Sequence, residues 1–281
     1  MRATLVASVC LIALTATSAQ AYVCTRASAA GPSLAWEPRT VELRPHDEDA
    51  AEVTRAQITD ALVFAAAQWN GVDCSDFLLD VGPVTDEQRV GFDWRAGRGD
   101  PVNQNVVIFR NGSALDGADA WLHPIGAIAI TTVTFIRSTG EIVDADVEMN
   151  DVSFRFTACE PEAPGCVVEH DVKNTLTHEL GHVLGLDHPP SSQSGAVEAT
   201  MFASASAGDT DKRDLAADDV AGVCSLYPAG LPNGECYGVE VSEPDPLVVR
   251  EVGCASTSVA PPAFAALVLV WVLRRVKRPR R

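Results

Sequence analysis

Three of the six histidines in this chain lie within eleven residues, in the stretch NTLTHELGHVLGLDHPP that spans residues 174–190. His178 and His182 are four positions apart, so on a helix their rings leave the same face one turn apart. Two neutral imidazoles held in this way can bind Zn²⁺, and Glu179 can direct a carboxylate at a water on the metal. The spacing therefore predicts a zinc site with a general base beside it.

The third ligand of a tetrahedral site must approach from another direction. Gly185 lies three residues after His182 and can take a positive φ, which lets the chain leave the helix and turn back. His188 is then well placed to complete the ligand set. Zinc with an open position supports peptide hydrolysis, in which Glu179 takes a proton from water and later gives it to the leaving amine.

The number of fixed positions makes this pattern specific. A bare H-E-x-x-H can occur by chance in a helix, but the longer H-E-x-x-H-x-x-G-x-x-H spacing, followed by a methionine turn, is the signature of metzincin zinc proteases. Met201 lies 13 residues after His188, at a suitable place for that turn. Met201 could also be an ordinary core residue.

The chain resembles the matrixins, the matrix-metalloprotease branch of the metzincins. HELGHVLGLDH (178–188) matches the active-site helix of that family, and LAADDVAGVCSLYP (215–228) resembles its closing helix with the pair Asp218 and Asp219. The resemblance spans about residues 33–228. It implies a zinc endopeptidase with a mixed five-stranded sheet, an active-site helix and a C-terminal helix. It also implies that residues 126–135 form the edge strand along which a peptide substrate lies.

The sequence departs from the family pattern in its inhibitory and accessory sites. No PRCGVPD-like segment precedes the domain, and Cys24 is either an inhibitory zinc ligand or half of a disulfide. The histidines of the family's structural zinc site are missing, since His46, His123 and His170 do not have the required spacing. Ala203 stands where related branches have a tyrosine ligand, which favours matrixins.

Calcium is a second candidate metal. By the resemblance, Asp144, Asp146 and Glu148 lie where the family has calcium ligands. Alternating acids on a strand are also common on a solvent-exposed face, so both interpretations stay open.

The periodicity of the apolar residues predicts the elements around the site. Residues 52–69 are expected to form a helix with Ile58, Leu62, Ala65 and Trp69 on one face. Strands are expected at 33–44, 77–81, 105–109, 126–136 and 141–149, the last two as a hairpin. Asp171 is a good N-cap for a helix running through His182, and a last helix is expected at 215–227. This pattern predicts one α/β (α+β) domain over residues 22–228.

The two ends of the chain have a different composition. Residues 1–21 read as a secretory signal peptide, with an apolar run at 3–16 and cleavage after Ala21. Residues 229–252 are rich in Pro, Gly and Glu, as a spacer would be. Residues 253–281 contain an 11-residue apolar run and six basic residues. This tail resembles the sorting tail of myxobacterial surface proteins, which implies a processing enzyme acting near Cys254. A permanent membrane anchor is the alternative.

Charge and cysteine content agree with export. The formal net charge is −17, and without Arg2 and the six basic tail residues it is −24, which disfavours nucleic-acid binding. Six cysteines remain once Cys10 and Cys254 are assigned to the two ends, which allows three disulfides. Only Cys159 and Cys166 are close enough in sequence to suggest a pair. The absence of C-x-x-C argues against a cysteine zinc site.

The leading hypothesis is a secreted zinc endopeptidase, expected to be monomeric, that is attached to the cell surface and acts on protein or peptide substrates. Residues 202–210 (FASASAGDT) are expected to form the wall of the pocket after the cleaved bond. A surface adhesin on a metalloprotease scaffold is the first alternative, but it has no need for the general base Glu179. A non-proteolytic zinc hydrolase is the second.

Overall fold

The computed structural model describes residues 22–112, 117–236, 238–239, 247–252 and 254–256. Its main feature is a mixed sheet in the order β13-β6-β7-β5-β3-β4, with β2 also paired to β7. The strands are β2 (Ala35–Trp36), β3 (Thr40–Pro45), β4 (Leu78–Val81), β5 (Asn105–Arg110), β6 (Ala129–Ile136), β7 (Glu141–Asn150) and β13 (Leu247–Val252). Only β6 runs antiparallel to its neighbours, β7 and β13.

The expected five-stranded sheet is present as β4-β3-β5-β7-β6, and the hairpin of β6 and β7 is confirmed. Two details differ from the sequence-based expectation. The strand expected at 33–44 is divided into β2 and β3 by a bend at residues 37–39, because Pro38 has a restricted φ and no N–H to donate to a ladder. The expected edge strand is not a free edge, since β13 pairs with it along six residues.

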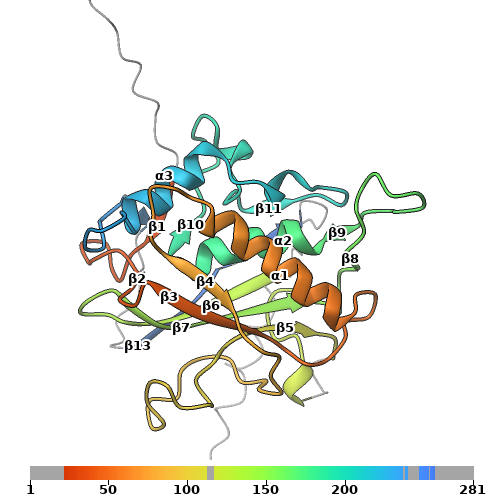
Figure 1. The fold of residues 1–281 in the computed structure, drawn as a ribbon, viewed down its shortest axis with the longest axis horizontal. Coiled ribbons are helices and arrows are strands. Elements are labelled where there is room, and N and C mark those ends of the chain that lie inside the picture. The colour runs from red at the N-terminus through yellow and green to blue at the C-terminus, as the bar shows by residue number, and fades with distance from the viewer. Residues whose placement is uncertain (1–21, 113–116, 237, 240–246, 253, 257–281) are drawn as a thin grey trace, which may run out of the picture.

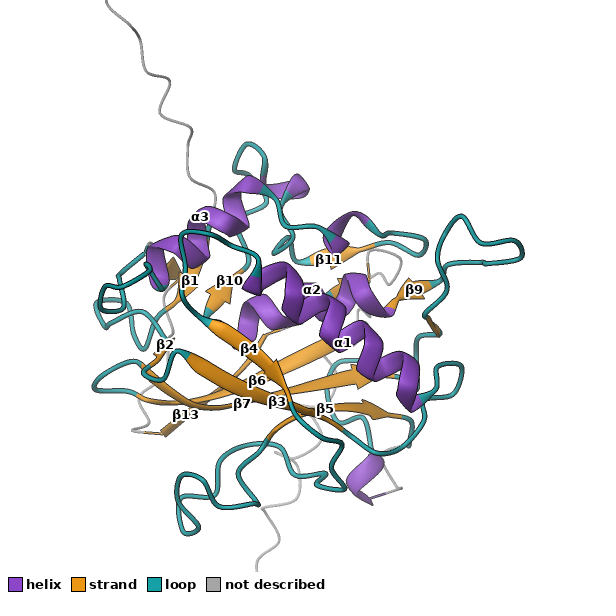
Figure 2. Ribbon diagram, viewed as in Figure 1, coloured by secondary structure: helices purple, strands orange, loops and turns teal. Residues whose placement is uncertain are grey.

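Two helices cover one side of the sheet (Figures 1 and 2). The helix α1 (Arg55–Asn70) begins at a Thr54 capping box, and the four residues expected on its inner face are all buried. The helix α2 (Val172–Val183) begins at Asp171, whose side chain accepts a hydrogen bond from the Asn174 amide, as predicted. Every residue of α2 except Lys173 is buried, because α2 packs against both α1 and β6. A helix enclosed in this way holds its side chains in fixed positions.

The shorter elements surround this core. The last helix, α3 (Ala217–Leu226), lies within the expected range and buries Val223 and Leu226. Among the residues that the structure describes, three small sheets lie outside the main sheet. The first joins β1 (Val23–Thr25) to β10 (Leu186–Asp187) and β12 (Gly238–Val239). The other two are β8 (Phe156–Thr157) with β9 (His170–Asp171) and β11 (Ser204–Ala205) with β14 (Ala255–Ser256). Short 3₁₀ helices occur at Gly117–Asp119, Ala196–Glu198 and Asp211–Arg213.

The six cysteines form three disulfides, as their number allowed. Cys159 pairs with Cys166, which confirms the one pairing that sequence proximity suggested. Cys24 pairs with Cys236, and Cys74 pairs with Cys224. Because Cys24 is in a disulfide, it is not an inhibitory zinc ligand.

Most of the two expected end segments lies outside the described residues: the signal peptide at 1–21, Gly253 and the tail at 257–281. Within the described part of the chain, no helix has the length and apolar character needed to cross a bilayer. The region expected to be a spacer contributes β12 and β13 to the folded domain. The domain boundaries themselves stay a prediction.

Candidate metal centre and catalytic site

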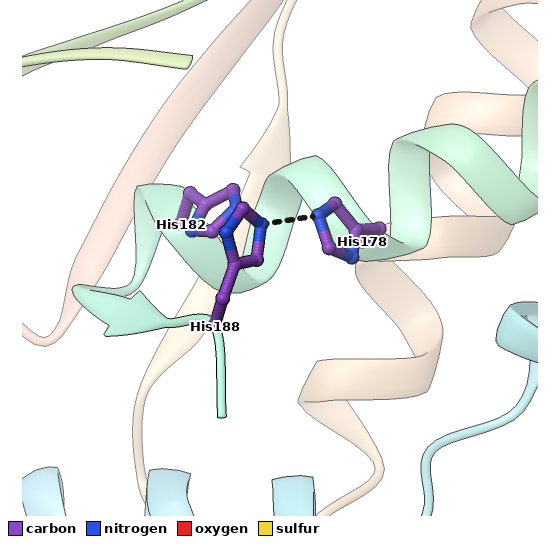
Figure 3. Close-up of side chains that lie close together, drawn as sticks. All are labelled: His178, His182 and His188. Atoms are coloured by element: carbon purple, nitrogen blue, oxygen red, sulfur yellow. Dashed lines mark hydrogen bonds between the residues drawn. The ribbon is translucent and has the colours of Figure 1, made fainter. Parts of the chain in front are cut away.

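The three predicted histidines converge on one point (Figure 3). The Nε2 atom of His188 lies 3.1 Å from Nε2 of His178 and 3.0 Å from Nε2 of His182. The first two rings come from successive turns of α2, and His188 follows β10. Gly185 makes this return possible: its φ is 96°, and a Cβ there would lie 2.4 Å from the carbonyl oxygen of Leu34. The predicted role of this glycine is confirmed.

Hydrogen bonds on the other ring nitrogens set the tautomers of the two helical histidines. Nδ1 of His178 lies 2.7 Å from the Thr200 carbonyl, and Nδ1 of His182 lies 2.8 Å from the Leu186 carbonyl. A carbonyl can only accept, so both Nδ1 atoms carry the proton and both Nε2 atoms keep a lone pair. Burial, together with the nearby Lys212 ammonium, also holds the pKa of His178 well below its usual value. Both rings can therefore offer an Nε2 lone pair toward the shared point.

This donor set fits a zinc ion. Tetrahedral zinc binds imidazole nitrogens at about 2.0–2.1 Å, so two such ligands lie about 3.3 Å apart, close to the separations seen here. The nitrogens of all three histidines lie within 4.8 Å of one another. Among the described residues, no other cluster of His, Cys, Asp or Glu meets this criterion. His178, His182 and His188 are thus the residues that would hold the metal.

Glu179 lies next to this cluster in a fully buried position. Its Oε2 accepts a hydrogen bond of 2.7 Å from the Thr131 hydroxyl, and its Oε1 accepts one of 3.1 Å from the backbone N–H of Cys254. Burial raises the pKa of Glu179 to about 7, although both hydrogen bonds favour the charged form. A carboxyl group with this pKa can both accept and release a proton near neutral pH.

Met201 lies beneath the metal-binding turn of α2, as expected for a methionine turn. It is 3% exposed, and a Cβ built on Gly181 would lie 2.2 Å from its Sδ and 2.9 Å from a ring carbon of Trp69. The two histidines of α2 flank Gly181 in sequence. The side chain of Met201 and the ring of Trp69 therefore set how deeply this turn sits in the core.

Gly181→Ala is expected to destabilise the protein. Alanine normally stabilises a helix interior by about 1 kcal/mol relative to glycine. Here the added methyl group overlaps Met201 and Trp69, and overpacking of this kind costs about 1–3 kcal/mol. A lower midpoint in urea unfolding is the expected result. In a Met201→Ala background the same substitution should cost less, because the nearest clash is gone; equal costs in both backgrounds would contradict this packing account.

The helix α3 supports the same turn through Asp219. Its carboxylate accepts hydrogen bonds from the backbone N–H of Thr200 at 2.7 Å and from that of Met201 at 3.1 Å. The carbonyl of Thr200 is the group that orients His178. A continuous set of hydrogen bonds therefore runs from α3 through the methionine turn to a metal ligand, and such supporting groups tune metal affinity.

Asp219→Ala is expected to weaken zinc binding by about tenfold, within the range for groups that support metal ligands. The cause is the loss of both acceptors that hold the Thr200–Met201 backbone. Competition with a chromophoric chelator measures the effect. Asp219→Asn should recover part of the affinity because it keeps one oxygen acceptor, and Asp214→Ala, at an exposed position, is the matched control. Unchanged affinity in Asp219→Ala would remove this residue from the support of the site.

Two residues of the site carry no signal in the sequence. Thr131 on β6 contacts Glu179 only because β6 packs against α2. Lys212 is buried, donates to the carbonyl of Phe202, and places its Nζ 3.3 Å from Nδ1 of His178. The shorter contact of that Nδ1 with the Thr200 carbonyl determines the histidine tautomer. Neither residue belongs to a local motif, so only the packing reveals them.

The acids considered for calcium have protein partners. Glu148 accepts from Arg110 at 2.7 Å and contacts His123 at 2.8 Å. Asp146 accepts from the backbone N–H groups of Gly91 at 2.6 Å and Val106 at 2.9 Å. Asp144 and Asp146 are buried, so they do not form a solvent-exposed face. Calcium binding at this strand stays a prediction.

Comparison with known proteins shows what the region around the site is similar to. Residues 109–228 match the protein family described as Matrixin. A 72-residue segment is 42% identical to Metalloendoproteinase 5-MMP of Arabidopsis thaliana and covers 26% of this chain and 18% of that protein. A 57-residue segment is 51% identical to Metalloendoproteinase 1-MMP of the same organism and covers 20% of this chain and 14% of that protein.

The chain thus spans less than a fifth of the length of these curated relatives. The match is local, and it includes α2, the methionine turn and α3, which build the three-histidine centre. The region that matches is therefore matrixin-like, and the α/β fold that holds it, with its three-histidine cluster, fits a metzincin-like fold.

Proposed function

We propose that this protein is a zinc-dependent endopeptidase that hydrolyses protein or peptide substrates. The observation that carries the proposal is the convergence of three histidine Nε2 atoms beside the buried carboxyl group of Glu179. A surface adhesin would need neither the open ligand set nor the general base. The names of the two plant relatives support the same class of activity.

The residues of the site would have different roles in the reaction. His178, His182 and His188 would hold zinc, which when bound supplies a Lewis acid that polarises the peptide carbonyl and activates water. Glu179 accepts the proton of the attacking water and passes it to the nitrogen of the leaving amine. Thr131 donates to Oε2 of Glu179, so the carboxyl group stays oriented while its other oxygen handles the proton.

Substrate binding would use the edge of the sheet. The edge of β6 that β13 covers runs beside α2, and an extended peptide could take the place of β13 there through main-chain hydrogen bonds. Beyond the metal centre, a cavity of about 340 Å³ is lined in part by Phe202, Ser204, Ser206, Asp209 and Lys212. These residues come from the expected pocket wall and the 3₁₀ helix after it, and the cavity would hold the side chain that follows the cleaved bond.

A peptidase assay tests the proposal. Purified protein with one equivalent of zinc is expected to cleave a denatured protein substrate, to lose this activity with 1,10-phenanthroline, and to regain it when zinc is restored. Cleavage that is insensitive to the chelator would contradict the zinc mechanism. Binding of a substrate protein without any cleavage would favour the adhesin, and hydrolysis of only non-peptide amides would favour the other zinc hydrolase.

We also propose that the protein is secreted and reaches the cell surface through its tail. Cleavage after Ala21 would leave Tyr22 as the first residue. The Tyr22 nitrogen already lies 2.8 Å from Oδ1 of Asp218, so a new ammonium group there would gain a carboxylate partner. Intact-mass measurement of the cell-associated protein tests both ends. A chain that retains residues 1–21 would contradict secretion, and one that retains the basic end would favour a permanent anchor.

A further inference from the structure

The strand β13 occupies the edge of the sheet to which a substrate would add. It pairs antiparallel with β6 from Leu247 opposite Ile136 to Val252 opposite Thr131. Three residues later the same segment pairs again, as β14, parallel to β11 in the expected pocket wall. The two parts of this segment, 247–252 and 255–256, thus pair with β6 and with β11, the two backbone surfaces that would bind a peptide.

Cys254 lies between these two strands and is bound through its backbone. Its N–H donates to Oε1 of Glu179 at 3.1 Å, and its carbonyl accepts from the backbone N–H of Ile128 at 2.7 Å. Its side chain is 1% exposed, with Sγ 4.0 Å from Nζ of Lys212, a residue that lines the cavity beyond the metal centre. Cys254 therefore takes the position of the substrate residue that follows the cleaved bond.

The contact with Glu179 places the backbone nitrogen of Cys254 at the reacting group. The nitrogen of Cys254 is the nitrogen of the bond that joins it to the preceding residue. In peptide hydrolysis this is the atom that must receive a proton from the general base as the bond breaks, and a productive separation is about 2.6–3.2 Å. The observed 3.1 Å lies within that range.

We propose that the chain's own segment 247–256 is the first substrate of this site, and that the protein hydrolyses the peptide bond on the amino side of Cys254 itself. The inference rests on the proposed function. One water is consumed: its oxygen forms a new bond to the carbonyl carbon before Cys254, and the C–N bond breaks. The products are a carboxylate at the end of the catalytic domain and a free amino group on Cys254. No redox partner is needed.

The geometry also explains why the chain would act on itself. A tethered segment binds at an effective concentration of the order of millimolar, so it competes strongly with free peptides until it is cut. A separate processing enzyme needs access to the same bond, but Cys254 is buried and its backbone is bound on both sides. The processing expected from the sequence near Cys254 is then a reaction of the catalytic site. It would separate the catalytic domain from the tail that brought it to the surface, and it would open the cleft to other substrates.

The experiment follows the full-length mature chain by intact mass after zinc is added to the purified apo-protein. We expect a fragment that ends at residue 253 and a second that begins with Cys254. The reaction should be first order with a rate independent of protein concentration, because the segment is bound in cis. Glu179→Gln keeps an oxygen that can accept from the Cys254 N–H but removes the base, so its rate should fall by about 10²-fold or more.

The outcomes separate this inference from the proposed function. If the wild-type chain cleaves an added protein but leaves its own bond intact, the self-cleavage is wrong and the peptidase stands. If Glu179→Gln is processed as fast as wild type, a contaminating enzyme does the work and the inference is also wrong. If the loaded wild-type chain cleaves neither substrate, the proposed function itself fails.

A second measurement tests whether segment 247–252 is bound in the cleft, and it does not depend on catalysis. Hydrogen exchange of full-length Glu179→Gln, followed by mass spectrometry, should show peptides covering 247–252 protected at least about tenfold relative to unstructured chain, because their amides pair with β6. Exchange of this segment at the rate of an unstructured peptide would show that it does not occupy the cleft, and would overturn the inference whatever the activity.

Discussion

His182→Ala is expected to abolish stoichiometric zinc binding and with it all peptidase activity. The substitution removes one of three nitrogens that lie within 4.8 Å of one another, and the two that remain cannot enclose the ion. It also removes the ring that donates to the Leu186 carbonyl, so that buried acceptor loses its partner. Metal analysis after gel filtration, with the wild-type chain holding about one zinc, measures the effect directly.

The matched control is His170→Ala. This residue is a half-buried histidine of β9 whose ring packs on Phe154 at 4.9 Å, and it is not a member of the three-histidine cluster. It should keep full zinc occupancy even if the fold is slightly less stable. Full occupancy in His182→Ala, measured in the same preparation series, would show that the metal is held elsewhere.

Glu179→Ala is expected to separate metal binding from catalysis. The three histidines are untouched, so zinc should bind with near wild-type stoichiometry, but turnover of an added peptide should fall by about 10²-fold or more without the general base. The substitution also removes a buried carboxyl group whose pKa is raised to about 7 by desolvation. Because burial disfavours its charged form, its loss should not unfold the protein.

Three measurements on the same sample decide the role of Glu179: zinc content, circular dichroism and kcat. Glu162→Ala, at an exposed position in the loop between Cys159 and Cys166, controls for the loss of an acidic side chain and should leave all three unchanged. Near-normal kcat in zinc-loaded Glu179→Ala would exclude this residue as the base. Loss of zinc as well as activity would mean that it acts on the ligands rather than on the proton.

The sequence alone determined what depends on short-range spacing. His178 and His182 share a face because a helix repeats every 3.6 residues, and Gly185 returns the chain toward His188 because only glycine takes its φ of 96° without strain. Short-range sequence patterns also predicted the Asp171 cap, the inner face of α1, the β6–β7 hairpin and the pairing of Cys159 with Cys166. Each of these is confirmed, because the interacting residues are close in the chain.

Only the tertiary structure decided the contacts between distant segments. The proton positions on the histidines depend on Thr200, which is held by Asp219 from another helix. Thr131 and Lys212 reach the site through packing that no motif encodes. The remaining disulfides close loops of 150 and 212 residues, and composition alone leaves such pairings open.

The largest difference between the sequence-based prediction and the structure concerns the C-terminal segment, for which the sequence predicted a spacer and a tail. A high content of Pro, Gly and Glu is typical of a segment without a core of its own. This composition carries no information on whether its backbone can pair with a strand more than a hundred residues away. Strand pairing uses main-chain N–H and C=O groups, which every sequence offers, so the exposed edge of β6 determined that β13 lies there.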